Sequence, residues 1–383
     1  MLDVKLIKNE KMKCLHICND FSLTKVHSNL YKNLDQLNVE QIIYNPTRNT
    51  TPIGNNIFEF KVHNSKVVYS KTLKVYHKVF FNSKIKFLEK NLLENENLSD
   101  VNLIHATTLF SDGALAYKLH QKKSIPYIVA VRATDLTVFL KYRKDLYSLG
   151  LQIINNASKL IFISDSLKNK FLNHPFLSNK KDEIEKKCIV IYNGIDDFWL
   201  NKTQLKKYNN KPQNILYVGR LIPRKKIINL ATAILELKNE GINFKLNIIG
   251  SGGADEEKLK EISNNNPDTV KCLGSINNKE ELLKNYSNND IFAMPSIGET
   301  FGLVYIEALS QGLPLLYSKA DGIDGVFDIN IGESCNGNDV LSIKNNLKKL
   351  FSNYSTYELH KIDFIEFNWK HIAQKYLNLY QSI

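Results

Sequence analysis

Short apolar runs alternate with amphipathic segments along almost the whole chain. Strands of a parallel sheet are buried on both faces and form continuous apolar runs, whereas the helices between them show a period of 3.6 residues. This alternation predicts a doubly wound parallel α/β sheet in the first half of the chain. The expected strands there are 14–18, 41–44, 103–105, 127–131, 160–163 and 188–192, and the expected helices are 26–37, 113–121 and 166–172.

A second alternating unit follows a polar segment, residues 201–213, that is rich in lysine and asparagine and contains a proline. Such a composition is typical of a linker. The expected strands of the second unit are 214–218, 244–249, 270–272, 291–294 and 312–316, with helices from 227 and from about 302. We therefore predict two α/β domains, residues 1–200 and residues 214–365.

Composition bounds the class of protein without naming a function. The chain has 383 residues, of which 43% are hydrophobic, and this is enough for two cores. It has no apolar run of about 18 residues and no signal-peptide pattern at its start, so we expect a cytoplasmic protein. The five cysteines lie mostly in strand-like runs, as reduced cysteines do. Cys14, His16 and Cys18 lack a second pair of ligands elsewhere, and we predict no metal site.

The formal net charge of +12 is concentrated in the first half of the chain. Residues 1–205 hold 30 basic and 19 acidic side chains, and the remainder holds 21 and 20. A helix from about Ser70 would place lysines on one side and Leu73, Tyr76, Phe80 and Phe87 on the other. This pattern fits a solvated face on a core helix, or peripheral binding to an anionic membrane. No nucleic-acid-binding signature accompanies it. The lysines concerned are Lys71, Lys74, Lys78 and Lys86.

Residues 295–314 carry the clearest chemical signal. A polar loop ends at Glu299, a helix begins near Gly302, and Glu307 follows one to two turns later. The unpaired amides of residues 301–303 at the helix start suit a diphosphate. Glu299 would then accept the hydroxyls of a sugar, and Glu307 those of a ribose. For the two glutamates alone, a solvated helix start is the alternative.

A glycine turn with basic residues follows the strand 214–218. In open parallel sheets ligands lie beyond the carboxyl ends of the strands, so Gly219, Arg220 and Lys225 emerge where a ligand is expected. Arg220 and Lys225 would bind a diphosphate through charge-assisted hydrogen bonds. The alternative is an ordinary basic loop in a lysine-rich protein. A further turn begins at Gly250, but Asp255 replaces the third glycine of a dinucleotide fingerprint, so neither NAD nor ATP chemistry is predicted.

These segments together resemble the Glu-x7-Glu and Gly-Arg-x4-Lys motifs of the large retaining glycosyltransferase family 4. The resemblance implies the GT-B fold, in which two Rossmann-like domains face a cleft and a C-terminal helix, here within 366–383, crosses back to the first domain. It implies no cofactor and no metal, with a UDP-sugar favoured as co-substrate. It assigns catalysis to Arg220, Lys225 and Glu299, and nucleotide binding to Gly219, Gly250, Ile276, Thr300, Phe301, Gly302, Leu303 and Glu307.

The first half departs from the family pattern. Where many members have a Gly-Gly turn after the first strand, this chain has polar side chains, and where many have His-Gly-x-Asp it has Arg132-Ala133-Thr134-Asp135. Arg132 and Asp135 are either structural partners or acceptor contacts. His105 ends a strand and is either a core residue or an acceptor contact. The candidate acceptor residues are Ser22, Thr24, Lys25, His105, Arg132 and Asp135.

The sequence therefore predicts a metal-independent, retaining transfer of a hexose or N-acetylhexosamine. The donor is a nucleotide-diphosphate sugar, and the acceptor is a saccharide, lipid-linked in our main hypothesis, in surface polysaccharide or glycolipid synthesis. One alternative is a catalytically silent scaffold that binds sugar nucleotide or lipid. Another is a sugar-nucleotide epimerase on the same fold. The oligomeric state is left open, and the location is cytoplasmic or peripheral on the inner face of the membrane.

Overall fold

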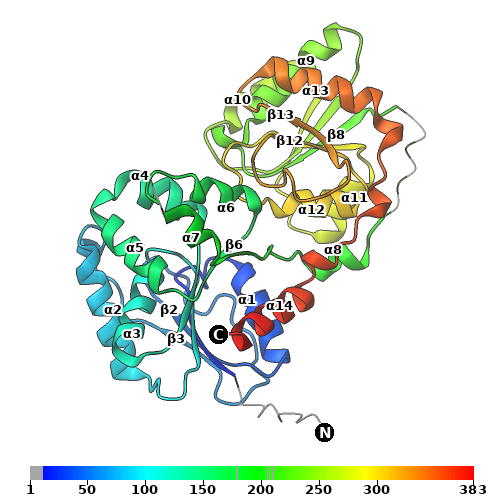
Figure 1. Cartoon of the computed structure of the whole chain (residues 1–383). Helices are drawn as coiled ribbons and strands as arrows, with labels where there is room; N and C mark the ends of the chain where they lie inside the picture. Colours follow the sequence, from blue (N-terminus) through cyan, green and yellow to red (C-terminus); the bar gives the residue numbers. More distant parts are fainter. Residues whose placement is uncertain (1–11, 178–179, 205, 207, 209–210) are drawn as a thin grey trace. The chain divides into compact units, whose positions relative to one another are not determined.

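The computed structural model describes residues 12–177, 180–204, 206, 208 and 211–383 (Figure 1). The chain divides into two compact units. Unit 1 comprises residues 1–163, 168–191 and 369–383, and unit 2 comprises 164–167 and 192–368. The polar segment 201–213, which we expected as a linker, falls within unit 2, and four of its residues lie outside the described part.

Unit 1 contains a seven-stranded sheet in the order β3-β2-β1-β4-β5-β6-β7, and every pair of neighbours is parallel. The strand order runs outward from β1 in one direction and then outward from β4 in the other, which is the doubly wound arrangement that the sequence predicted. The strands are β1 (Lys13–Ile17), β2 (Glu40–Asn45), β3 (Lys66–Tyr69), β4 (Leu103–Ala106), β5 (Tyr127–Ala130), β6 (Lys159–Phe162) and β7 (Cys188–Val190).

Helices connect these strands, as parallel neighbours require. Thr24 caps the first of them, because its side chain accepts a hydrogen bond from the amide of Val26. The helices are α1 (Lys25–Gln36), α2 (Phe81–Asn95), α3 (Gly113–Lys123), α4 (Leu140–Tyr142), α5 (Tyr147–Asn156), α6 (Asp165–Leu172) and α7 (Lys181–Glu185). Short turns of helix add η1 (Val75–Lys78), the π-helical η2 (Asp135–Phe139) and η3 (Lys144–Leu146).

Unit 2 repeats the plan with a six-stranded parallel sheet in the order β10-β9-β8-β11-β12-β13. Its strands are β8 (Asn214–Val218), β9 (Lys245–Ile249), β10 (Val270–Gly274), β11 (Ile291–Met294), β12 (Leu315–Ser318) and β13 (Gly332–Cys335). Its helices are α8 (Asp197–Asn201), α9 (Ile227–Asn239), α10 (Glu256–Asn265), α11 (Lys279–Ser287), α12 (Leu303–Ser310) and α13 (Val340–Ser352), with short turns η5 (Pro223–Lys225), η6 (Tyr354–Thr356), η7 (Leu359–Lys361) and η8 (Ile365–Phe367).

The last helix, α14 (Trp369–Gln381), belongs to unit 1 although it follows unit 2 in the sequence. It is drawn in red in Figure 1 and packs against α1. Its apolar residues recur every three or four positions, so one face is buried in the same core as β1 and β4. The buried residues of α14 are Trp369, Ile372, Ala373, Tyr376, Leu379 and Tyr380.

The helix that we expected from about Ser70 is wrong. Residues 66–69 form strand β3, η1 is a single turn, and the helix begins only at Phe81. Tyr76 and Phe80, which we placed on the buried side, are 50% and 63% exposed. The lysine spacing fitted a helix, but β-branched residues such as Val75 and Val79 are less favourable in a helix than in an extended segment.

Within the described residues, no helix is both long enough and apolar enough to cross a membrane.

Candidate functional site

The winding of the unit 2 sheet reverses between β8 and β11. At such a reversal the loops after the two strands diverge to opposite faces and leave space for a ligand beyond their carboxyl ends. Residues 219–225 follow β8, and residues 295–302 follow β11. The two segments that the sequence singled out therefore lie at the same edge of one sheet.

Lys225 and Glu299 meet at this edge. The Lys225 Nζ atom lies 2.5 Å from Glu299 Oε2, and both side chains are largely buried. Burial lowers the pKa of the Lys225 ammonium, and the Glu299 carboxylate opposes that change through its charge and its hydrogen bond. The structure thus brings together two of the three residues to which the resemblance assigned catalysis.

Arg224 also faces this carboxylate, and the sequence analysis did not select it. Its Nη1 atom lies 3.6 Å from Glu299 Oε2, and its carbonyl accepts a hydrogen bond of 2.7 Å from the amide of Ile297. The residue stands directly before Lys225 in η5, so a search of the whole basic turn would have found it. Arg220, by contrast, is exposed at the start of the turn, and its carbonyl accepts a hydrogen bond from the Tyr217 hydroxyl.

Helix α12 presents its N-terminus next to Glu299, as the sequence predicted. Gly302 has a φ of 79°, and the helix proper starts at Leu303. A side chain on Gly302 would lie 2.7 Å from the Tyr305 ring, so only glycine fits this turn. In the part of the chain that the structure describes, the amides of Thr300, Phe301, Gly302 and Leu303 donate no hydrogen bond. They remain available to an anion.

Glu307 lies in the following turns of α12. Its Oε2 atom accepts a hydrogen bond of 3.2 Å from the Tyr286 hydroxyl. Burial raises the pKa of the Glu307 carboxyl to about 7, although the Tyr286 hydrogen bond acts in the opposite direction. This carboxyl therefore changes its charge near neutral pH.

The backbone between β8 and β9 is closely packed. The Gly219 amide donates to the Ile249 carbonyl at 2.9 Å, and a Cβ atom on Gly250 would lie only 1.9 Å from the Gly219 carbonyl oxygen. Gly250 has a φ of 148°, which other residues rarely adopt. The two glycines thus allow two loops at the sheet edge to touch.

A hollow of about 400 Å³ is lined by Gly250. It is formed by the end of β10, the turn at Gly250 and one side of α10. Ile276, the predicted base contact, is half-buried two residues after Gly274, which lines the hollow. A hollow of this volume is within the range of small-molecule sites.

The first group of acceptor candidates surrounds the start of α1. Ser22 is buried, and its hydroxyl donates to Asn45 Oδ1 at 2.7 Å. Thr24 uses its side chain as the helix cap. Lys25 is exposed. Ser22 and Thr24 therefore already hold structural hydrogen bonds, and Lys25 is the side chain of the three that remains accessible.

His105 lies in the core of unit 1. It is 1% exposed, its Nδ1 atom is hydrogen-bonded to the Tyr380 hydroxyl at 2.7 Å, and its ring stacks on Tyr376. Burial lowers the pKa of this imidazole well below its ordinary value. These contacts favour the structural interpretation of His105 over an acceptor contact.

Arg132 and Asp135 differ in their burial and in their hydrogen bonds. The buried Asp135 carboxylate accepts hydrogen bonds from the amides of Leu109, Phe110 and Arg132, at 3.1, 3.2 and 2.8 Å. Asp135 therefore braces the loop after β4. Arg132 is half-buried, and its Nε atom donates to the Thr107 carbonyl.

A polar cluster at the reversal point of the unit 1 sheet escaped the sequence analysis. Asp112 is buried, and its Oδ2 atom accepts hydrogen bonds of 2.9 Å from both Asn19 and Thr107. Burial raises the pKa of Asp112 to about 7. Asp112 directly precedes a helix that starts at Gly113, and this helix-start signal is what could have pointed to it.

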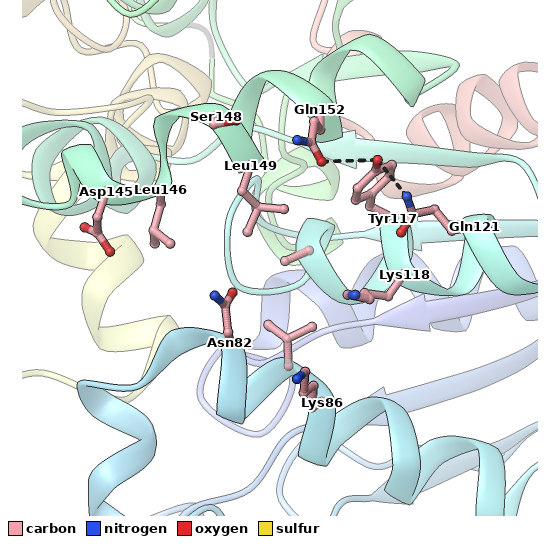
Figure 2. A pocket seen from close by; sticks show the side chains of 12 residues that line it. Asn82, Lys86, Tyr117, Lys118, Gln121, Asp145, Leu146, Ser148, Leu149 and Gln152 are labelled. Carbon is pink, nitrogen blue, oxygen red and sulfur yellow. Dashed lines mark hydrogen bonds between the residues drawn. The ribbon is translucent and has the colours of Figure 1, made fainter.

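Figure 2 shows a second hollow, of about 550 Å³, between α2, α3 and α5 of unit 1. On one wall the Gln121 amide donates to the Tyr117 hydroxyl, which donates to Gln152. Lys86 lines this hollow, but none of the predicted acceptor residues does. Among the described residues, no group of three or more His, Cys, Asp or Glu side chains is arranged to hold a metal ion.

Comparison with known proteins gives a family match in unit 2 and a likeness of fold over the whole chain. Residues 198–362, most of unit 2, match the model of a family described as glycosyl transferases group 1. A structure of the HepE protein of Anabaena, solved in complex with UDP, superimposes with a TM-score of 0.69 at 14% identity over 98% of this chain and 100% of that one. The chain has the GT-B fold.

Two relatives extend the comparison beyond the fold. An uncharacterized glycosyltransferase of Methanocaldococcus jannaschii is 28% identical over 270 residues, which are 69% of this chain and 68% of the relative. A capsular polysaccharide biosynthesis glycosyltransferase of Staphylococcus aureus is 29% identical over 53% of this chain and 54% of its own length. The matched family and both relatives are thus described as glycosyltransferases.

Proposed function

We propose that the protein is a retaining glycosyltransferase that moves a hexose or N-acetylhexosamine from a nucleotide-diphosphate sugar to a saccharide acceptor. The observation that carries the proposal is the site at the reversal point of the GT-B fold's second sheet. There Lys225, Glu299 and the unoccupied amides at the start of α12 converge. The site combines cations and amides for a diphosphate with a carboxylate for sugar hydroxyls.

The chemistry follows from the charge that develops as the glycosidic bond stretches. Negative charge grows on the phosphate oxygen of the leaving nucleoside diphosphate. Lys225, Arg220 and the amides of residues 301–303 would stabilise it without a metal, because fixed donors act strongly in a water-poor site. Glu299 has two tasks in this proposal. It orients the sugar hydroxyls, and it keeps the buried Lys225 charged.

Glu307 would bind the ribose hydroxyls of the nucleotide. Its carboxyl lies on the helix that presents the diphosphate-binding amides, so one rigid element positions both parts of the donor. UDP is the favoured nucleotide. The capsular polysaccharide biosynthesis relative is the basis for proposing a role in surface polysaccharide or glycolipid synthesis. We further propose a lipid-linked acceptor and peripheral contact of the basic unit 1 with an anionic membrane surface.

Release of nucleoside diphosphate tests the reaction. The purified protein is incubated with UDP-glucose or UDP-N-acetylglucosamine, with and without lipid-linked saccharides from a bacterial membrane extract, in the presence of EDTA. We expect UDP release that depends on the extract and persists in EDTA. NMR of the product then reports the anomeric configuration, which retention leaves unchanged.

The matched variants are Arg220→Ala and Glu307→Ala. We expect Glu307→Ala to raise the KM for the donor, and Arg220→Ala to lower kcat as well. Unchanged kinetics in both variants would show that this site does not bind the donor. Epimerisation of the donor without acceptor, or donor binding with no turnover, would favour the epimerase or the silent scaffold instead.

A further inference from the structure

A short segment of unit 1 exposes four large apolar side chains. Val75, Tyr76, Val79 and Phe80 are 81%, 50%, 69% and 63% exposed. They lie within six consecutive residues, on η1 and just after it. We call these four residues the apolar tip. Exposed apolar side chains that are clustered rather than scattered mark a surface that contacts a partner.

Three buried residues before, within and after the apolar tip anchor it in unit 1. Leu73, His77 and Phe81 are 6%, 2% and 6% exposed, so they anchor the segment in unit 1 at a spacing of four residues. The Leu73 amide also donates to the Thr47 carbonyl at 2.9 Å. The outward direction of the apolar tip is therefore fixed by packing.

A second exposed segment adjoins it. The Phe81 ring contacts the Phe139 ring at 6.0 Å between centroids, and the Arg143 guanidinium lies over Phe81 at 5.9 Å. Val138, which precedes Phe139, is 46% exposed, and Tyr142, which precedes Arg143, is 66% exposed. Residues 138–142 therefore lie beside Phe81, the residue that follows the apolar tip.

Lysines surround this surface. Lys74, Lys78, Lys141 and Lys144 are all exposed, and none of them forms an ion pair with another described residue. Lys71 is exposed as well, and its Nζ atom lies 4.0 Å from Glu94 Oε2, which is a long distance for an ion pair. The surroundings of the apolar tip therefore carry unneutralised positive charge.

The amides of the last two residues of the apolar tip are paired within the segment. The amides of Val79 and Phe80 both donate to the Tyr76 carbonyl, at 3.1 and 2.9 Å. The His77 amide donates to the Lys74 carbonyl, and the Lys74 amide donates to His77 Nδ1. The paired amides of Val79 and Phe80 can therefore enter an apolar medium without losing hydrogen bonds to water.

We propose that the apolar tip inserts into the interface of an anionic lipid bilayer, with the surrounding lysines on the headgroups. Apolar side chains next to a tyrosine and ringed by lysines match a bilayer, whose apolar layer lies beneath an anionic surface. The proposal deepens the membrane contact proposed above and rests on it for the class of partner. It replaces a lysine-faced helix by a tip that enters the lipid.

Vesicle flotation tests the insertion. The full chain is mixed with phosphatidylcholine vesicles that contain or lack phosphatidylglycerol. We expect binding only to the anionic vesicles, and a loss of roughly tenfold or more in the doubly substituted V79S/F80S protein, because two apolar side chains no longer enter the lipid. Ile53→Ser is the matched control, since Ile53 is 64% exposed on unit 1 outside the apolar tip, and we expect it to bind as the wild type does.

Salt separates insertion from a purely electrostatic contact. The K74Q/K78Q protein should lose most of its binding to anionic vesicles at a lower salt concentration than the wild type does. Equal flotation of the wild type and V79S/F80S would overturn the proposal. Absence of wild-type binding to the anionic vesicles at low salt would also overturn it. In that case, loss of self-association or of binding to another protein in V79S/F80S would identify a protein as the partner of the apolar tip.

A tryptophan at the tip gives a second readout. Trp199 and Trp369 are both buried, so the additional emission of a Phe80→Trp variant comes from the tip. We expect that emission to shift to the blue on anionic vesicles and to be quenched by brominated acyl chains. Emission that stays water-like on bound vesicles would contradict insertion. Donor binding by V79S/F80S, measured without vesicles, should match the wild type, so failure of this proposal is distinguishable from failure of the proposed function.

Discussion

Lys225 depends on Glu299 for its charge. Burial lowers the pKa of Lys225, and Glu299 is the nearest group that raises it. In Glu299→Gln that support is lost, so we expect the basic limb of the pH–kcat profile to move to lower pH, in addition to a fall in kcat of roughly 100-fold at neutral pH. Steady-state kinetics across the pH range measures both effects.

Glu281→Gln, on an exposed helix start of unit 2, serves as the control and should leave the profile unchanged. A Glu299→Gln enzyme with lower kcat but an unshifted basic limb would show that Glu299 acts on the sugar alone.

Glu307 should make donor binding depend on pH. Its carboxyl has a pKa raised to about 7, and only the ionised form accepts two ribose hydroxyls. We therefore expect the affinity for UDP to rise by up to roughly tenfold between about pH 6 and about pH 8. Calorimetric titration measures the dissociation constant at each pH.

Two variants sharpen this prediction. Glu307→Gln should flatten the dependence. Tyr286→Phe removes the hydrogen bond that lowers the Glu307 pKa, so it should move the dependence to higher pH. An identical profile in the wild type and Glu307→Gln would rule out the ribose contact.

At the level of single residues, spacing and type located part of the site. Arg220, Lys225 and Glu299 stood out because glycine turns and helix starts follow apolar strands in a recognisable order. Asp112 did not, because its partners come from segments about ninety residues away or from its own turn. The core position of His105 also depends on a distant partner, Tyr380, which no local pattern reveals.

At the level of elements, α14 is tied to unit 1 by a buried hydrogen bond. Replacing Tyr380 by phenylalanine leaves His105 Nδ1 without its partner in the core. We expect Tyr380→Phe to lower the free energy of unfolding of unit 1 by about 1–3 kcal/mol. Urea unfolding followed by Trp369 fluorescence in a Trp199→Phe background measures it, because Trp369 lies on α14 itself.

Tyr376→Phe is the matched control on the same helix. Its ring also contacts His105, but its hydroxyl is not the partner of His105 Nδ1. We expect a clearly smaller effect from this variant. Equal losses in the two variants would show that the hydrogen bond to His105 does not stabilise the packing of α14.

The period of the apolar residues predicted most helices and strands, but it failed where apolar side chains are exposed. The sheets and their order of winding follow from continuous apolar strands between amphipathic helices. Residues 70–80 broke the rule, because the pattern assigns apolar side chains to the core, whereas Val75 and Phe80 face outward. A sequence pattern alone cannot distinguish a core face from a surface that is apolar for another reason.

For the whole of unit 1, pH acts on stability in two directions. Burial lowers the pKa of His16 and His27 to about 3, and raises that of Asp112 to about 7 and Asp135 to about 6. Below pH 6.5 the unfolded histidines bind protons that the folded ones do not, so they cost stability as pH falls. The two aspartates bind more protons when folded and gain stability as pH falls toward their unfolded pKa.

His27→Gln isolates one of these contributions. The stability of the wild type relative to this variant should fall by roughly 1 kcal/mol between about pH 7 and about pH 5.5, because only the wild type carries the buried imidazole. Urea unfolding at the two pH values, followed by Trp369, measures the difference. A difference independent of pH would mean that His27 titrates normally in the folded protein.

The most direct test of the donor site is thermal unfolding of unit 2, followed by Trp199 in a Trp369→Phe background. UDP-, GDP-, ADP- and CMP-sugars are each added with and without EDTA. At a hundred times its dissociation constant a ligand adds about 2.7 kcal/mol, and this raises the midpoint by roughly 5–10 °C. We predict such a rise with one nucleotide class, unchanged by EDTA and absent in Lys225→Ala. No rise with any of the four, or a rise that EDTA abolishes or that Lys225→Ala retains in full, would contradict a metal-independent diphosphate site at Lys225 and Glu299.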